Sequence, residues 1–280
     1  MLALLKRNFL LYFRNRSGVF FSLLGALISF ILYIIFLQKN LTDAWAQLPN
    51  SAPVLNNWLM SGTLAVTGIT TSLAALTQLV KDREHQVDQD LYLSDQGKWR
   101  LAFSYLTSAI IISFSMQILM YVLMCGYFRE VPTLSLLPEV LLIMLLSSLL
   151  SSLVNAIFVY FFHSVDSLGK FSTIVGTASG FLVGTYVPLG VLPNFAQLLM
   201  KCTPATYIAA LYRRVLMKEA LSETFKGQDN LLQEFQEKMG VQLKWQTLLT
   251  KEQTYLIVLG GILLALGIWI SLAKRSSKRK

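Results

Sequence analysis

The stretch SGFLVGTYVPLGVLPNF, residues 179–195, lies at the end of a long apolar run. It contains three glycines and two prolines, Pro188 and Pro193. Proline has no backbone N–H and interrupts a helix, and backbone groups left unpaired in lipid cost several kcal/mol each. The pattern predicts a helix that stops near Tyr186–Leu192, turns, and re-enters the outer face through residues 194–202. A broken helix of this kind suits a gate, although a proline-capped helix end has the same signature.

The composition places this stretch in a membrane protein. The chain has 280 residues, of which 54% are hydrophobic and 14% are charged. A run of about 20 apolar residues can cross a bilayer as a helix. The first apolar run lacks a convincing small-residue cleavage site, so it is interpreted as a span and not as a signal peptide. We predict an all-α integral membrane protein whose six spans cover about 17–37, 59–80, 101–128, 137–162, 171–192 and 254–273.

The distribution of Lys and Arg predicts the topology. These residues are frequent in 1–16, in 81–100 and in the last seven residues, whereas the short loops on the other side carry only Lys39 and Arg129. Short basic segments remain in the cytoplasm, so both termini are predicted to be cytoplasmic. The long segment 193–253 is predicted to be external and to form short helices without a core of their own. The net charge of +9 therefore reflects topology, and no nucleic-acid partner is predicted.

Residues 1–16 have the pattern of an amphipathic helix lying in the cytoplasmic lipid interface. A plain basic flank before the first span is the alternative. The predicted apolar face consists of Leu2, Leu5, Phe9, Tyr12 and Phe13. Arg7 and Arg14 lie on the opposite, basic face.

Residues 81–100 form the most polar predicted cytoplasmic segment. Charges of both signs are mixed there, which suits a protein-contact surface, and a solvated loop is the alternative. An apolar edge favours a short docking helix and consists of Val87, Leu91, Tyr92 and Leu93. The charged residues are Lys81, Arg83, Glu84, His85, Asp88 and Asp90.

Two predicted spans carry stripes of hydroxyl or small residues at helical spacing. Such stripes gain nothing from facing lipid, so they face other helices or a pathway. The residues alone leave packing and pathway lining equally open. The stripes are Thr63, Thr67, Thr70 and Thr77 in the second span, and Thr173, Thr177, Gly180 and Gly184 in the fifth.

Several classes of function are excluded or disfavoured. No ionisable residue lies in the core of a predicted span, which disfavours ion-coupled carriers and membrane-embedded enzymes. No GxxxxGK[ST] phosphate loop and no metal-ligand spacing occur, so neither ATP binding by that route nor a metal site is predicted. Cys125 and Cys202 both fall near the outer face; a disulfide is one interpretation, and two unpaired thiols are the favoured one.

The order of these features resembles the ABC-2 type permeases. The resemblance is carried by a glycine-bearing fifth span, a Pro-x4-Pro sequence, and a further Pro and Tyr about ten residues on. It extends over the amphipathic start, the six spans, the charged loop after span 2 and the long external segment. The residues that match are Gly180, Pro188, Leu192, Pro193, Pro204 and Tyr207.

The resemblance implies the membrane subunit of an ATP-binding-cassette exporter in a bacterial plasma membrane. Such a subunit is not an enzyme by itself and binds no cofactor. It works with two separate ATPase subunits, which hold ATP and Mg, and with a second permease copy or a close relative. A hydrophobic or amphipathic substrate, such as a drug, peptide or lipid-like toxin, is implied. A non-transporting sensor or immunity protein on the same fold is the alternative.

The resemblance also implies roles for the residues singled out above. The charged residues of 81–90 fall where a coupling helix docks on the ATPase. The stripes of the second and fifth spans fall on the helices that line the pathway. The external gate corresponds to Tyr186, Pro188, Leu192 and Pro193.

Overall fold

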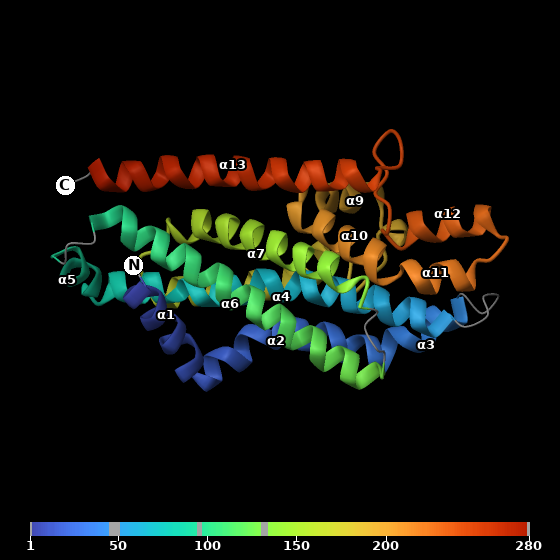
Figure 1. Cartoon of the computed structure of the whole chain (residues 1–280), viewed down its shortest axis with the longest axis horizontal. Helices are drawn as coiled ribbons and strands as arrows, with labels where there is room; N and C mark the ends of the chain where they lie inside the picture. Colours follow the sequence, from blue (N-terminus) through green and yellow to red (C-terminus); the bar gives the residue numbers. More distant parts are fainter. Residues whose placement is uncertain (1, 45–50, 94–96, 130–133, 279–280) are drawn as a thin grey trace.

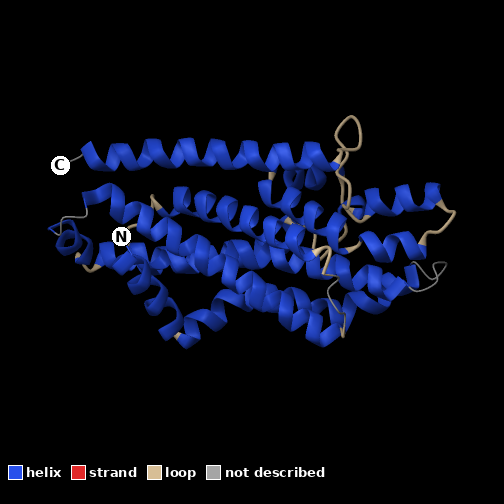
Figure 2. Ribbon diagram, viewed as in Figure 1, coloured by secondary structure: helices blue, strands red, loops and turns tan. Residues whose placement is uncertain are grey.

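The structure is a computed structural model that describes residues 2–44, 51–93, 97–129 and 134–278. Within these ranges every regular element is a helix, apart from one isolated backbone bridge between Lys244 and Leu248. Figures 1 and 2 show an elongated bundle whose longest helices run along a common axis. The prediction of an all-α protein is confirmed.

The chain passes through thirteen α-helices and two shorter helical turns in the described residues. They are α1 (Leu2–Arg14), α2 (Arg16–Leu32), η1 (Tyr33–Leu37), α3 (Gln38–Ala44), α4 (Ser51–Glu84), α5 (Val87–Leu93), α6 (Gly97–Phe128), α7 (Leu137–Val159), α8 (Val165–Leu182), η2 (Leu189–Val191), α9 (Asn194–Cys202), α10 (Pro204–Leu216), α11 (Lys218–Thr224), α12 (Asp229–Lys238) and α13 (Lys251–Lys278).

Five helices are long and apolar enough to cross a membrane, and they correspond to five of the six predicted spans. The remaining predicted span, the fifth at 171–192, overlaps only the later part of α8, which has 18 residues and ends at Leu182. At 1.5 Å per residue it reaches about 27 Å, slightly less than the ~30 Å hydrocarbon core. The five helices cover Arg16–Leu41, Ser51–Glu84, Trp99–Phe128, Leu137–Val159 and Lys251–Arg275.

The central element is α4, which packs against α2, α6, α7, α8 and α10. Of its most apolar window, 89% is buried inside the chain. Its small and hydroxyl residues allow neighbouring helices to approach closely. Several of the hydroxyls donate to backbone carbonyls of the same helix, as when Thr67 Oγ1 donates to the Thr63 carbonyl at 2.8 Å. With 34 residues, α4 reaches about 51 Å and connects the two ends of the bundle.

Both ends of the described chain lie at the same end of the bundle as α5, whereas α3, α11 and α12 lie at the opposite end (Figure 1). We call these the α5 end and the α12 end. The α12 end has its own apolar core, which includes Trp58, Phe225 and Phe235, each at most 3% exposed. The predicted short helices of 193–253 are present, and the core into which they pack is shared with α4 and η1. The core was not visible in the sequence because part of it comes from α4 and η1, far away in the chain.

Candidate functional site

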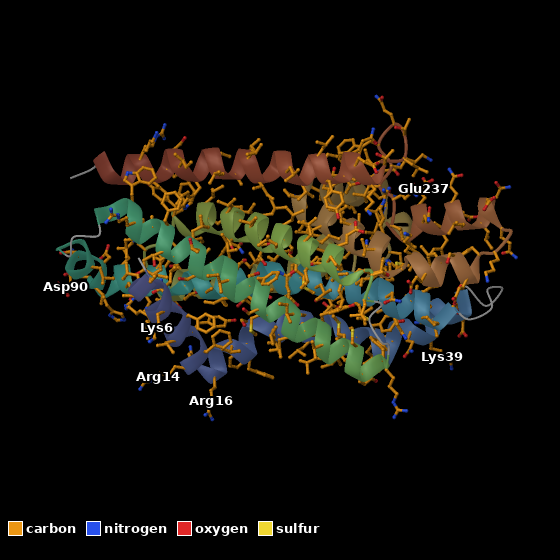
Figure 3. The ribbon with its side chains drawn as sticks, viewed as in Figure 1. Lys6, Arg14, Arg16, Lys39, Asp90 and Glu237 are labelled. Carbon is orange, nitrogen blue, oxygen red and sulfur yellow. The ribbon has the colours of Figure 1, made fainter. Side chains whose placement is uncertain are left out.

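The charged segment that follows α4 is mostly helical. α4 continues to Glu84, and α5 begins at Val87 after a turn in which Gln86 has a φ of +59°. Lys81, His85 and Asp90 are exposed. Figure 3 shows Asp90 on α5 at the extreme end of the bundle. The short helix predicted within 81–100 is present, and these three residues form a surface that a partner can reach.

Two of the six charged residues in this segment hold other helices instead. Arg83 Nη1 donates to the carbonyls of Tyr160 (3.4 Å) and Phe162 (2.9 Å), at the end of α7. Glu84 Oε2 accepts from the Val165 N–H at 2.9 Å, at the start of α8. A cation at a helix C-terminus and an anion at an N-terminus both complement the helix dipole. These two side chains therefore tie the end of α4 to the junction between α7 and α8. Asp88, the sixth residue, is half-buried.

Asp82, which was not among the predicted site residues, is the most buried charge at the α5 end, at 3% exposure. Its carboxylate accepts two hydrogen bonds from Arg7, at 2.8 and 2.9 Å, and others from Gln78 and the Tyr105 hydroxyl. The hydrogen bond that Arg7 donates to Asp82 raises the pKa of Arg7, which keeps the guanidinium charged. We call Arg7, Gln78, Asp82 and Tyr105 the Asp82 cluster. The available signal in the sequence was the seven-residue spacing from Ala75, which places Asp82 on the same helix face as an apolar residue.

The Asp82 cluster corrects the prediction made for α1. Arg7 was expected to point away from the bundle towards lipid headgroups, but it points inwards because Asp82 needs a counter-charge. Arg14 is exposed, and Figure 3 shows it directed away from the bundle together with Lys6 and Arg16. Apolar Leu2 and Leu10 are also exposed, at 82% and 55%. α1 thus keeps an amphipathic surface while one of its arginines is anchored to α4.

The hydroxyl stripe of α4 is divided by the packing. Thr63 and Thr67 are fully buried, while Thr70 and Thr77 are half-buried. Other polar side chains, which were not singled out as site residues, connect the helices around this stripe. Gln117 of α6 donates to Ser148 Oγ at 2.8 Å and accepts from the Tyr212 hydroxyl at 2.8 Å. Asn155 of α7 donates to Ser72 Oγ and the Ile69 carbonyl.

The stripe of α8 is accessible over much of its length. Thr173 and Thr177 are exposed, and their hydroxyls donate to carbonyls one turn earlier in the same helix. A Cβ added at Gly176 would meet no other atom within 4 Å. Gly180, in contrast, is buried against the ring of Tyr186. The two threonines and Gly176 therefore form an open polar face on α8.

The break in this region comes earlier than Tyr186–Leu192, where it was predicted. α8 ends at Leu182, and Gly184 adopts a φ of +72°. The Thr185 N–H donates back to the Gly180 carbonyl at 2.8 Å, which closes the helix end. A glycine in the left-handed conformation is a common helix stop, because it avoids the steric cost of a Cβ. The glycine, and not the first proline, ends the helix.

The free carbonyls at this helix end are bound by α10. Arg213 Nη2 donates to the carbonyls of Val183 (3.1 Å) and Gly184 (2.8 Å), and Nη1 donates to that of Gly240 (3.2 Å). Thr206 Oγ1 donates to the Leu182 carbonyl at 2.8 Å. A cation is favourable at a helix C-terminus, where carbonyl groups carry the negative end of the dipole. The broken backbone is thus shielded by protein, as a low-dielectric environment requires.

Arg213 is fully buried, at 0% exposure, and its guanidinium lies 5.2 Å from the centre of the Trp58 ring. No carboxylate pairs with it among the described residues. Burial lowers the pKa of Arg213 to about 9, so the side chain remains charged at neutral pH. Trp58 Nε1 donates to the Met239 carbonyl at 2.8 Å. We call Trp58, Gly184, Arg213 and Gly240 the Arg213 cluster; it joins α4, α10, and the ends of α8 and α12.

The residues expected to form an external gate lie directly beyond this cluster. The Tyr186 ring packs edge-on against Phe181, with ring centres 4.8 Å apart. Pro188 is buried and precedes η2, Leu192 is half-buried, and exposed Pro193 precedes α9. α9 presents Phe195, Leu198 and Leu199 at 54–69% exposure. The segment therefore presents an apolar helix face to the outside of the bundle.

The remaining predictions concern cysteine and metal. Cys125 and Cys202 are both free thiols, as favoured from their sequence context. In the part of the chain that the structure describes, no three His, Cys, Asp or Glu side chains gather in a way that could hold a metal ion.

Comparison with known families matches residues 32–269 to a model described as ABC-2 family transporter protein. The matched region begins at the end of α2 and continues almost to the end of α13, so it includes α5, the Arg213 cluster, and the Asp82 cluster apart from Arg7. No curated protein matches the chain. Together with the five apolar helices, the match assigns a multi-pass membrane transport component. The chain belongs to the ABC-2 family of transporter proteins.

Proposed function

We propose that the chain is the permease subunit of an ABC exporter in a bacterial plasma membrane. It moves a hydrophobic or amphipathic substrate, such as a drug, peptide or lipid-like toxin, out of the cell. Separate ATPase subunits bind ATP and Mg and dock at the α5 end. A second permease copy or a close relative completes the pathway.

The observation that carries the proposal is the mechanical connection of α8 to α4. At the start of α8, the Val165 N–H is held by Glu84 of α4. At its end, the Val183 and Gly184 carbonyls are held by Arg213, which also stacks on Trp58 of α4. A displacement of α5 is transmitted along α4, because packed helices move as rigid elements. Both ends of the broken helix would follow that movement.

The open polar face of α8 supports a pathway shared with a second copy. Thr173 and Thr177 are exposed in a helix that would lie within the bilayer. Polar residues in such helices face other helices or a water-filled cavity and not lipid. If 183–192 completes the crossing begun by α8, a partner subunit covers this face and the two α8 helices enclose the path.

The chemistry of this face supports the substrate class. No acidic or basic side chain lies between Lys170 and the end of α8, and the exposed residues there include Thr173, Ile174, Thr177 and Phe181. A wall of hydroxyl, aliphatic and aromatic groups suits an apolar or amphipathic molecule, since ligand sites are mostly apolar with few polar groups. The outward direction of transport rests on the family resemblance.

The docking of the ATPase is tested by co-purification from native membranes in mild detergent, followed by an ATPase assay. The exposed residues of the α5 end are the ones to reverse, in the double variant Lys81→Glu with Asp90→Lys. Like charges brought together at an interface cost several kcal/mol, so we expect bound ATPase to fall at least about tenfold. The matched control is Lys39→Glu, an exposed lysine towards the opposite end of the bundle (Figure 3).

A second variant separates docking from transmission. Glu84→Gln removes the charge at the α8 start without changing the exposed surface of α5, so the ATPase should remain bound while transport falls. If the double reversal retains as much ATPase as the control does, α5 is not the docking site. If the unaltered chain purifies without a nucleotide-hydrolysing partner in several detergents, the permease proposal fails and a sensor or immunity protein replaces it.

A further inference from the structure

A cavity of about 90 Å³ lies at the α5 end, between α4, α6, α7 and α13. Its inner wall is apolar and includes Leu76, Leu106, Val159 and Trp269. About three water molecules occupy the same volume in liquid water. The cavity therefore admits a few methylene groups but not a whole drug or peptide. α8 contributes no residue to its lining. The cavity is therefore separate from the open face of α8.

The cavity lies beneath a lipid-facing helix. α13 packs on α7 and α10, and only 17% of its apolar window is buried. Near the cavity, α13 meets α6 through Trp269, whose ring packs edge-on against Phe103 with centres 5.0 Å apart. The Trp99 ring also lies near Phe103, with ring centres 6.2 Å apart, and it lines the cavity as well. Aromatic side chains of this kind are enriched at membrane interfaces.

The charged residues around the cavity are mainly basic. Arg83 and Asp88 are the two charged residues in its lining, and no carboxylate pairs with Arg83 in the described parts of the chain. Exposed Arg100 adjoins Trp99 in the sequence, and exposed Lys274 and Arg275 follow lining residue Ala273. This end is the cytoplasmic end by its excess of basic residues. Basic pockets between membrane helices on that side bind anionic lipid headgroups.

We propose that this cavity binds an anionic phospholipid of the cytoplasmic leaflet. The beginning of one acyl chain enters between α6 and α13, and the phosphate lies at Arg83. The remainder of the lipid covers the outer surfaces of α6 and α13. The proposal concerns binding by this chain alone, so it does not depend on the ATPase partner or on export.

The position of the site implies a regulatory effect, and this part rests on the proposed function. Tyr105 lines the cavity and also donates its hydroxyl to Asp82. Arg83 holds the end of α7, and Asp88 belongs to α5. A bound lipid therefore contacts three parts of the region that would receive the ATPase movement. Occupancy should hold α5 in place and raise coupled ATPase activity.

Binding is tested with the purified, delipidated full chain in mild detergent. Dioctanoylphosphatidylglycerol is titrated, and binding is followed by native mass spectrometry and by the melting temperature. Dioctanoylphosphatidylcholine has the same chains without the net charge, and glycerol 3-phosphate has the phosphate without the chains. We expect phosphatidylglycerol to bind at least about tenfold more tightly than either. Equal affinity for the choline lipid, or equal affinity for glycerol 3-phosphate, would overturn the proposal.

Two variants locate the site. Ala102→Phe fills the cavity from α6 and should abolish the preference for phosphatidylglycerol, whereas Ala196→Phe, at a half-buried alanine on α9, should retain it. If Ala102→Phe does not fold, Asp88→Asn serves instead. Removing this carboxylate should tighten phosphatidylglycerol binding about fivefold, since one charge near an anionic lipid contributes about 1 kcal/mol. Unchanged affinity in Ala102→Phe, or in Asp88→Asn, would place the lipid elsewhere.

Discussion

The buried arginine of α10 offers the sharpest test of how the broken helix is held. Arg213→Met keeps an apolar stem of similar length but removes three hydrogen bonds from a charged donor to the carbonyls of Val183, Gly184 and Gly240. Hydrogen bonds to charged groups contribute about 1.5–3 kcal/mol each. The methionine also avoids the cost of burying a charge, which offsets part of this loss. A net destabilisation of about 3 kcal/mol is expected.

This loss is measurable as a melting temperature of the purified chain in detergent. At about 2–4 °C per kcal/mol, the expected fall is about 6–12 °C. Arg213→Lys keeps the charge but has no planar fork to reach three carbonyls, so its fall should be smaller. Arg100→Met, at an exposed arginine, is the matched control and should shift the melting temperature little. If Arg213→Met melts within about 2 °C of the unaltered chain, the carbonyls do not depend on Arg213 and the reasoning is wrong.

Three further outcomes follow from the contacts. Gly184→Ala should lower the free energy of thermal unfolding by about 1–2 kcal/mol, because Gly184 has a φ of +72° and the new Cβ would lie 2.9 Å from a methionine methyl. Gly176→Ala is the control: the new Cβ would meet open space, so this variant should be neutral or stabilising. Arg7→Gln should destabilise the fold by about 1–3 kcal/mol, because it leaves a buried carboxylate without its counter-charge. The loss should be larger than that of Asp82→Asn, and a double-mutant cycle in which the two losses simply add would contradict this reasoning. Gln117→Leu should cost about 1–3 kcal/mol by removing the acceptor of a buried tyrosine hydroxyl, and an unchanged melting temperature would show that the link between α6 and α10 is dispensable.

Regular, local patterns in the sequence were sufficient for much of the fold. Long apolar runs predict membrane helices because lipid leaves backbone groups no partner outside their own helix. Five such helices are present, and the short helix predicted after α4 is α5. The turn after α8 followed from the glycines and prolines of 179–195. The helix was predicted to end at the prolines, but it ends earlier, because the left-handed backbone of Gly184 stops it.

The partners of charged side chains were decided by tertiary structure. Arg7 appeared to be a headgroup ligand on a helical wheel, but a carboxylate 75 residues away turns it inwards. Arg83 and Glu84 appeared to belong to one docking surface with Asp90, yet Arg83 binds the end of α7 and Glu84 binds the start of α8. Residues adjacent in the sequence point around a helix in different directions, and what each one faces depends on which distant helix packs there.

The membrane class, the rough positions of five long helices, the break that follows α8 and the family resemblance could all be inferred from the sequence alone. These features depend on periodicity, composition and chain order, which are local. Only the tertiary structure decided that Asp82 and Arg213 are the buried charges around which the two ends of the bundle are organised. Both lie in polar segments that a hydropathy pattern assigns to solvent. Burial of a charge is stable only where distant groups supply hydrogen bonds or a counter-charge, and those groups come together only when the helices pack.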